Sequence, residues 1–341
     1  MVDIGDWMTR LAGWGLPGAT ALPPVPAPMA GLLAPVRGEK LTGVLAAAVA
    51  AGDVDVTDTD RELLLTAHRD AMAEVLLLED VLLDAVDLLD RAGVAHRVLK
   101  GSALAHLVHP DPAQRCFGDV DLLVEGRHVG RAVDAFVAAG GCRVQPQLSP
   151  VFDERFAKSV TLRWQRSVEI DLHRTLAPGP YGLLLRVDDL RSSPVRFELA
   201  GRALDTLPVD MHLVHGALHA ALGDVEPRLG NLRDLALMLT RPGLDVDHVI
   251  GTARRWRCEA PVAEGLAAVE DLVGLVPLVK WAVDFVPSPD DVRLLAGYRE
   301  REGRFRRQAM SSMRVLSTWS DRAAYLRSVA RIPTRLRGRS R

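Results

Sequence analysis

The chain has 341 residues, is 48% hydrophobic and 25% charged and carries a net charge of −2, which is ordinary for a folded water-soluble protein with room for two domains. It contains no run of about 18 apolar residues and no basic segment followed by an apolar core at its start, so we expect neither a membrane span nor a secretory signal. Its three widely spaced cysteines argue against a disulfide framework or a zinc knuckle and fit a cytoplasmic protein.

Residues 1–56 are predicted to be an arm that ends in a short helix. An amphipathic piece, DWMTRLAGWG, is followed by the proline-rich stretch LPGATALPPVPAPMAGLLAPV. Proline lacks the amide hydrogen that helices and central strands require, so we expect no regular helix or central strand in this stretch. The alanine-rich residues 40–52 are expected to be helical.

Residues 57–204 are predicted to form a mixed α/β core. A long helical pattern begins with Asp58 or Thr59 as N-cap and ends at Gly93. AHRVL is then a predicted strand, SALAHLV a short helix, HPDPAQR a loop and GDVDLLV a second strand. RHVGRAVDAFVAAGG is helical in period, and TLRWQ and VEIDLH are typical of two strands paired through a short turn.

Residues 205–322 show helical patterns only, and residues 323–341 are an arginine-rich tail. From Arg299 to Arg341 there are 13 arginines and three acidic residues, a net charge of +10 against −12 for the rest. This asymmetry indicates either an anionic partner for the tail or a solvated, partly disordered segment. The predicted fold class is α+β, a mixed sheet flanked by helices and followed by an all-helical C-terminal domain.

Two carboxylates lie close together in the stretch VLKGSALAHLVHPDPAQRCFGDVDLLV, residues 98–124. Strand residues i and i+2 point to the same side, so Asp119 and Asp121 share one face, with Cα atoms roughly 6.6 Å apart. Adjacent carboxylates repel each other, and a divalent cation removes that cost. Such a pair is able to hold two Mg²⁺ ions about 3.5–4 Å apart, the separation used in phosphoryl transfer.

A two-ion site usually has a third carboxylate, and VEIDLH offers Glu169 and Asp171. These residues are again an i, i+2 pair, and the apolar residues between and beside them face the other way. The spacing alone leaves both candidates open.

The glycine turn before the aspartate pair is suited to phosphate. Gly101 lets the backbone approach a phosphate without a Cβ in the way, and the amides at the start of the following helix favour anions. Ser102 can donate to a phosphate oxygen, and Arg115 could clamp a phosphate in bidentate fashion. Lysine is rare in this chain, with only Lys40, Lys100, Lys158 and Lys280, which draws attention to Lys100 beside the turn.

The order of these motifs resembles the nucleotidyltransferase superfamily typified by DNA polymerase beta. More closely, LKGSALAHLVHPDPAQRCFGDVDLLV is similar to a bacterial family of uncharacterised nucleotidyltransferases, and IDLH, HLVHGALHAAL and LRDLALML match its later elements. The resemblance spans residues 60–240 and implies a nucleotidyltransferase-type mixed sheet.

By this resemblance, Asp119 and Asp121 would bind both Mg²⁺ ions, and Asp171 would complete the site nearest the acceptor hydroxyl. The adjoining His173 belongs to the matched element and favours Asp171 over Glu169, although the resemblance assigns the histidine no role.

The resemblance also implies a nucleotide-binding set at the turn. Gly101 and Ser102 would cradle the triphosphate of an NTP, and Lys100 and Arg115 are further candidate phosphate contacts.

Other polar residues have plainer interpretations. His212, His215 and His219 fall on one side of a helix, but no fourth ligand of suitable spacing accompanies them, so a packed or cleft-lining helix is expected rather than a zinc site. Asp234 lies in an apolar helix and either faces the cleft or caps a neighbouring helix. Cys116 is expected to be incidental.

The leading hypothesis is a Mg²⁺-dependent nucleotidyltransferase that moves a nucleotidyl group from an NTP to a hydroxyl of an unknown peptide, sugar, small molecule or RNA by a two-metal mechanism. One alternative keeps the fold but uses a nucleotide sugar as donor in natural-product or cell-surface modification. Another is a non-catalytic nucleic-acid- or membrane-binding protein that acts through the basic tail.

Overall fold

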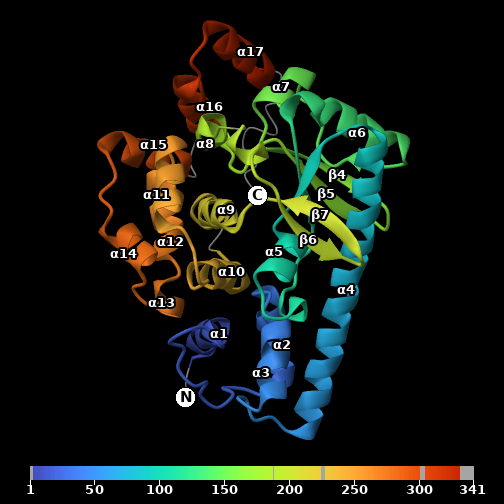
Figure 1. Cartoon of the computed structure of the whole chain (residues 1–341), viewed down its shortest axis with the longest axis vertical. Helices are drawn as coiled ribbons and strands as arrows, with labels where there is room; N and C mark the ends of the chain where they lie inside the picture. The colour runs from blue at the N-terminus through green and yellow to red at the C-terminus, as the bar shows by residue number, and fades with distance from the viewer. Residues whose placement is uncertain (1–2, 187, 224–226, 300–303, 331–341) are drawn as a thin grey trace.

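The structure is built around a β-sheet that has helices on both sides (Figure 1). The computed structural model describes residues 3–186, 188–223, 227–299 and 304–330. Within these residues it has seven strands in the order β3-β4-β5-β2-β1-β7-β6. The strands are His96–Leu99 (β1), Val120–Val124 (β2), Cys142–Arg143 (β3), Ser159–Trp164 (β4), Val168–His173 (β5), Val195–Leu199 (β6) and Arg202–Thr206 (β7).

The sheet is mixed, as predicted. β2 pairs antiparallel with β1 and parallel with β5, and β1 pairs parallel with β7. The predicted pairing of β4 with β5 is confirmed and is antiparallel. The hairpin of β6 and β7 was not predicted from the sequence. Its turn residues are Ala200 and Gly201, at φ values of 49° and 78°, and alanine at the first position lacks the usual Asn-Gly or Asp-Gly signal.

The two faces of the sheet pack against different cores. Leu122 faces the core that contains apolar residues of α4 (Asp58–Arg91) and α6 (Val129–Ala138). Leu123 points to the opposite face and joins the core of the helices that follow the sheet in sequence. Successive strand residues alternate between faces, so Asp121 lies on the same side as Leu123, towards those helices.

Helices surround the sheet, and after β7 the described residues form helices only, as predicted. The remaining α-helices are Ile4–Gly13 (α1), Met29–Gly38 (α2), Thr42–Ala51 (α3), Gly101–Leu107 (α5), Pro150–Arg155 (α7), Gly179–Leu184 (α8), Val209–Leu222 (α9), Leu229–Leu239 (α10), Val246–Arg255 (α11), Glu259–Ala267 (α12), Glu270–Val273 (α13), Pro277–Asp284 (α14), Pro289–Arg299 (α15), Arg304–Val315 (α16) and Trp319–Ala330 (α17). Short 3₁₀ helices span Pro112–Gln114, Gly126–His128 and Asp189–Arg191.

The expectation that the proline-rich stretch holds no regular helix is wrong for its last part. Helix α2 begins after Pro28 and continues through Pro35. Met29, Leu32 and Val36 lie on one side of this helix and are almost fully buried. Burial of each such side chain contributes about 1.5–3 kcal/mol, which together outweighs the cost of about 3 kcal/mol for a proline inside a helix.

The N-terminal helices are part of the folded body. Trp7 of α1 is fully buried and belongs to the same core as Leu213 of α9. Arg233 of α10, only 2% exposed, donates to the carbonyl oxygen of Ala12 at 2.7 Å. Figure 1 shows α1 lying beside α10. The four-part division of the chain stays a prediction. Within its first part, residues 1–56, helix α1 is anchored on the helices that follow the sheet.

Helices α9 and α12 are in close backbone contact at Gly265. A Cβ atom there would lie 2.0 Å from the carbonyl oxygen of Ala217. We expect Gly265→Ala to lower the free energy of unfolding by about 1–3 kcal/mol, because the two helices must move apart. Chemical denaturation followed by circular dichroism measures this change.

Gly130→Ala is the matched control for this crossing. Gly130 is also helical, but a Cβ atom there has nothing within 4 Å. The higher helix propensity of alanine predicts no loss of stability at this position. Equal stability of the two variants would contradict the close crossing.

The last described helix, α17, packs onto the body through one side. Tyr325, 8% exposed, contacts Phe156 with ring centroids 5.3 Å apart. Much of the predicted basic tail, residues 323–341, falls on residues 331–341, which lie outside the described residues. Among the described helices, none has both the length and the apolar character that a bilayer crossing requires.

Candidate active site

Strands β2 and β5 place two carboxylates side by side. The strands run parallel, and Asp121 lies directly opposite Asp171 in their register. Asp121 is 4% exposed, whereas Asp171 is half-buried and accepts a hydrogen bond from Thr161 Oγ1 at 2.5 Å. Asp119 lies one residue before β2, and both of these carboxylates act electrostatically on it. The three acids that were predicted from the sequence therefore meet on one side of the sheet.

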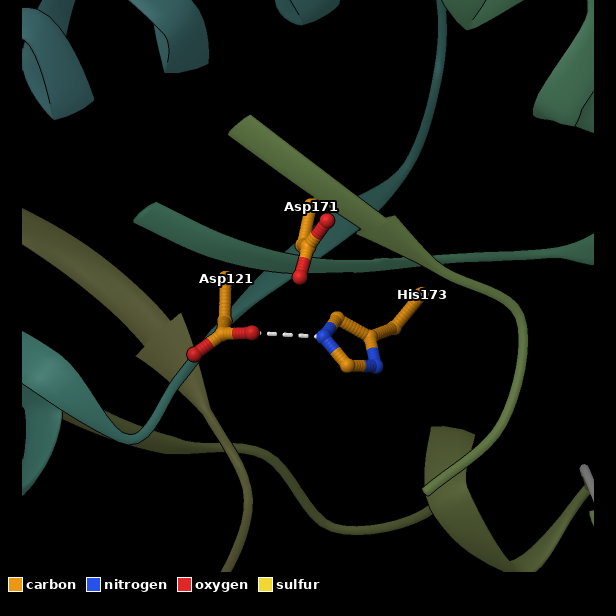
Figure 2. A group of neighbouring side chains, drawn as sticks. All are labelled: Asp121, Asp171 and His173. Atoms are coloured by element: carbon orange, nitrogen blue, oxygen red, sulfur yellow. Dashed lines mark hydrogen bonds and ion pairs between the residues drawn. The ribbon is translucent and has the colours of Figure 1, made fainter. Parts of the chain in front are cut away.

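His173, at the end of β5, forms a compact group with Asp121 and Asp171 (Figure 2). It is fully buried, and its Nε2 lies 2.5 Å from Asp121 Oδ1. One ligand atom each from Asp121, Asp171 and His173 lies within 4.8 Å of the others. In the described part of the chain this is the group with the composition and spacing of a metal site.

The glycine turn lies next to the carboxylates because of strand register. Leu99, the last residue of β1, is opposite Asp121 of β2. Lys100 follows at φ 44° and Gly101 at φ 30°, and a left-handed conformation at a lysine is a strained one. This conformation leaves Lys100 Nζ 3.3 Å from Asp121 Oδ2. Such local strain is typical of functional sites.

The neighbouring charges separate the pKa values of the two aspartates. Burial, followed by the Asp121 carboxylate, raises the pKa of Asp119. Burial also acts to raise the pKa of Asp121, but Lys100 and His173 outweigh it and hold that pKa well below its usual value. For Lys100, burial is outweighed by Asp121 and Asp119, so its pKa is raised and the lysine stays protonated. Positively charged side chains of the protein thus partly balance the negative charge of the two carboxylates.

Two further lysines face this acidic group, and neither was predicted as a site residue. Lys158, just before β4, and Lys40, between α2 and α3, both interact electrostatically with Asp119. Burial lowers the pKa of both lysines. Three of the four lysines in the chain therefore lie around the carboxylates, although they come from three separate segments. The scarcity of lysine was the signal that could have revealed them.

Ser102 carries a hydroxyl group that lacks a partner within the described structure. The residue is 2% exposed, and its Oγ makes no hydrogen bond. A buried hydroxyl without a partner costs about 1–3 kcal/mol. Its position in the glycine turn suits a ligand oxygen, which is the contact predicted from the sequence.

Arg115 fastens the turn to the helical part. Its Nη1 donates to the carbonyl oxygen of Gly101 at 2.9 Å, and its Nη2 donates to Asp234 Oδ2 at 2.8 Å. His109 Nε2 lies 2.7 Å from the other oxygen of Asp234. Burial acts to raise the pKa of Asp234, but Arg115 and His109 outweigh it and the pKa is lowered. Of the two roles left open for Asp234, helix capping is not what it does here. A phosphate contact by Arg115 stays a prediction.

The histidine-bearing helix is α9, and its histidines differ in environment. His212 and His215 are each 1% exposed, whereas His219 is exposed. His212 Nε2 lies 2.8 Å from Thr206 Oγ1, and burial lowers the pKa of His212 to about 3. Two of the three histidines are therefore packed in the interior and the third faces outward.

Glu169, the rival third carboxylate, has a different environment. It is exposed and pairs with Arg163 of β4 at 3.0 Å. Asp171 instead lies opposite Asp121, so the geometry favours Asp171.

The sequence profile of the family described as uncharacterised nucleotidyltransferase matches residues 28–274, more than two thirds of the chain. The chain belongs to this family. The resemblance read from the motifs is confirmed and extends further than residues 60–240, since the family region begins just before α2 and ends just after α13. The nucleotidyltransferase-type mixed sheet with flanking helices and a helical C-terminal part is likewise confirmed.

Among solved structures, the crystal structure of an antigenic nucleotidyltransferase-like protein from Paracoccidioides brasiliensis is similar to this family member. The similarity covers 62% of this chain and 93% of that chain, at 15% sequence identity and a TM-score of 0.35. No curated protein matches the sequence. The chemistry of the site therefore rests on the geometry of this chain and on its family.

Proposed function

We propose that this family member transfers a nucleotidyl group from an NTP to a hydroxyl acceptor with the help of two divalent cations, with Mg²⁺ as the ion expected on oxygen ligands. The observation that carries the proposal is the register of β1, β2 and β5. It aligns Asp121 with Asp171 of β5 on one side and with Leu99 of β1, directly before the Lys100–Gly101 turn, on the other. Carboxylates for cations and a turn for phosphates thus adjoin each other.

The residues present fit the proposed cations. Asp119, Asp121 and Asp171 offer three carboxylates on one side of the sheet. Burial and then the Asp121 carboxylate raise the pKa of Asp119, and a bound cation would oppose both effects. When bound, the cations would neutralise phosphate charge and favour ionisation of the acceptor hydroxyl.

The side chains around the acids have separate proposed roles in the transfer. Ser102 Oγ would donate to a phosphate oxygen, which satisfies a hydroxyl that lacks a partner here. Lys100, now 3.3 Å from Asp121, would turn to the departing pyrophosphate, since it is protonated and reaches the same side of the turn. Asp171, which is less buried than Asp121, would receive or orient the proton of the acceptor hydroxyl. The bond that breaks joins the α-phosphorus to the bridging oxygen of pyrophosphate.

Arg115 is proposed as a further phosphate contact, and its present bonds support a second role. Because it donates to the carbonyl oxygen of Gly101, it fixes the turn on which the phosphates would lie. Positioning of this kind is a main source of rate enhancement in phosphoryl transfer.

The donor can be tested directly. The full chain is incubated with Mg²⁺ and with fractionated cell extract as the source of acceptors. One reaction contains NTPs labelled at the α-phosphate, and a parallel reaction contains nucleotide sugars labelled in the sugar. We expect label in an acceptor fraction, with release of pyrophosphate, from an NTP. Label transferred from the nucleotide sugars alone would replace this proposal with the glycosyl-transfer alternative. The anionic partner of the basic tail stays a prediction.

Ser102→Ala separates ligand binding from folding. We expect the free energy of unfolding without ligand to stay the same or rise slightly, because the lost hydroxyl has no partner. The Kd for a non-hydrolysable NTP analogue should rise by roughly 5- to 10-fold, the equivalent of one hydrogen bond of about 1–1.5 kcal/mol. Calorimetric titration measures the Kd.

Ser317→Ala serves as the control, since Ser317 is exposed and lies between α16 and α17. An unchanged Kd in Ser102→Ala would remove the serine from the nucleotide site.

A further inference from the structure

The hydrogen-bonding pattern of His173 suits a metal ligand. Its ring is fully buried, and Nδ1 lies 3.4 Å from the carbonyl oxygen of Thr175. A carbonyl oxygen only accepts, so this contact places a proton on Nδ1. Histidines that bind metals commonly donate one ring N–H to a backbone carbonyl and present the other nitrogen to the ion.

The other nitrogen of His173 then faces carboxylate oxygens. Nε2 lies 2.5 Å from Asp121 Oδ1, and an oxygen of Asp171 belongs to the same close group. A carboxylate oxygen only accepts, so a proton lies between these two atoms here, and a bound cation would take the place of that proton. Metal–ligand bonds of about 2.0–2.2 Å place ligand atoms on opposite sides of an ion about twice that distance apart. His173 Nε2 and Asp121 Oδ1, now 2.5 Å apart, would therefore have to move apart to admit an ion, and the three ligand atoms already lie within 4.8 Å of one another.

A second histidine supports the presence of a ligand at this point. His215 of α9 contacts the ring of His173 edge to face, with centroids 6.3 Å apart. It is 1% exposed, yet neither of its ring nitrogens has a hydrogen-bond partner in the described structure. Buried polar atoms without partners are rare and commonly mark an absent water or ion.

We infer that Asp121, Asp171 and His173 form a mixed oxygen and nitrogen cation site that binds Mn²⁺ in preference to Mg²⁺. This inference rests on the proposed function for the presence of divalent cations and adds the identity of one of them. Mg²⁺ prefers an all-oxygen shell, so an imidazole donor shifts the preference towards transition-metal ions. Mn²⁺ is the transition-metal ion that best suits the two carboxylates. The second position, beside Asp119, has carboxylate ligands and keeps the expected Mg²⁺.

The test measures binding to the full chain without any nucleotide. Electron spin echo envelope modulation of Mn²⁺ added to the protein detects a directly bound imidazole nitrogen. We expect a ¹⁴N modulation in the wild type that changes to the ¹⁵N pattern when the protein is produced with ¹⁵N-labelled histidine. This isotope exchange requires no variant and is independent of folding effects.

Competition titration with Mn²⁺ and Mg²⁺ then tests the role of His173. We expect His173→Gln to weaken Mn²⁺ binding by roughly 10- to 100-fold and Mg²⁺ binding by less. The matched control is His96→Gln, because His96 begins β1 at the end of the strand away from the turn. Loss of the ¹⁴N signal only in His173→Gln supports the site.

Two results would overturn the inferred Mn²⁺ site. One is a wild-type spectrum without nitrogen coupling, and the other is equal affinity of the wild-type protein for Mn²⁺ and Mg²⁺. Nitrogen coupling without nucleotidyl transfer in the labelled assay would leave this site standing and remove the proposed function. Nucleotidyl transfer without nitrogen coupling would support the proposed function and remove the inferred Mn²⁺ site, since His173 would then only position Asp121.

Discussion

Asp121→Asn is expected to reduce nucleotidyl transfer by about 100- to 1,000-fold, the cost typical of removing one electrostatic element from an active site. Asp121 is the carboxylate at the centre of the group, in contact with both Lys100 and His173. An asparagine has nearly the same shape but carries no charge, so it neither attracts a cation nor balances Lys100. Single-turnover assays with an α-labelled NTP measure the effect, and circular dichroism checks that the variant is folded.

Glu169→Gln is the matched control for this prediction. It makes the same change of a carboxylate to an amide, on strand β5, at an exposed position whose partner is Arg163. We expect transfer within about twofold of the wild type, because the exposed pair contributes little. Comparable losses in the two variants would contradict the placement of the active site around Asp121.

Asp234→Ala is expected to lower the free energy of unfolding by about 3–5 kcal/mol, the usual result of removing one partner of a buried ion pair. Arg115 is 6% exposed and would keep its charge without a carboxylate, and His109 would lose its partner too. Urea denaturation at neutral pH measures the change. The matched control is Asp205→Ala, since Asp205 pairs with Arg196 at the surface and its removal should cost less than about 1 kcal/mol.

The pH dependence of this effect follows from the direction of the Asp234 pKa. The pKa is lower in the folded chain than in the unfolded one, so the stabilisation is complete above the unfolded value of about 3.9 and is lost as the pH falls through the lower folded value. We therefore expect a constant difference between wild type and Asp234→Ala from pH 5 to 8 that shrinks only in strong acid. A difference in the free energy of unfolding of less than 1 kcal/mol at pH 7 would show that the buried charge of Arg115 does not need the Asp234 carboxylate.

The sequence predicted those parts of the site that depend on local periodicity. The i, i+2 spacing was sufficient to place Asp119 and Asp121 on one face, and the apolar flanks were sufficient to recognise β2 and β5. The alignment of Asp121 with Asp171 was beyond such reasoning, because it depends on which strands pair and in which register. The same limit explains why no role for His173 follows from the sequence, since its partner Asp121 lies 52 residues away.

Long-range contacts account for the other differences. Arg115 and Asp234 are 119 residues apart, and no local pattern links them. Lys40 and Lys158 are far from Asp119 in the sequence. They reach it only when the N-terminal arm and the start of β4 have folded next to the carboxylates. The prediction for α2 is wrong because proline acts against a helix only locally, whereas burial of the apolar side of α2 decides the outcome.

The three lysines around the acids have a consequence for how the protein is made. Lys40, Lys100 and Lys158 bring positive charge to a group of carboxylates that would otherwise repel one another. The chain therefore carries its own counter-ions while it folds, and a newly synthesised molecule does not have to wait for metal to acquire its shape. Under the proposed function, cations that bind the carboxylates would displace these side chains, so cation loading would govern turnover and not structural integrity.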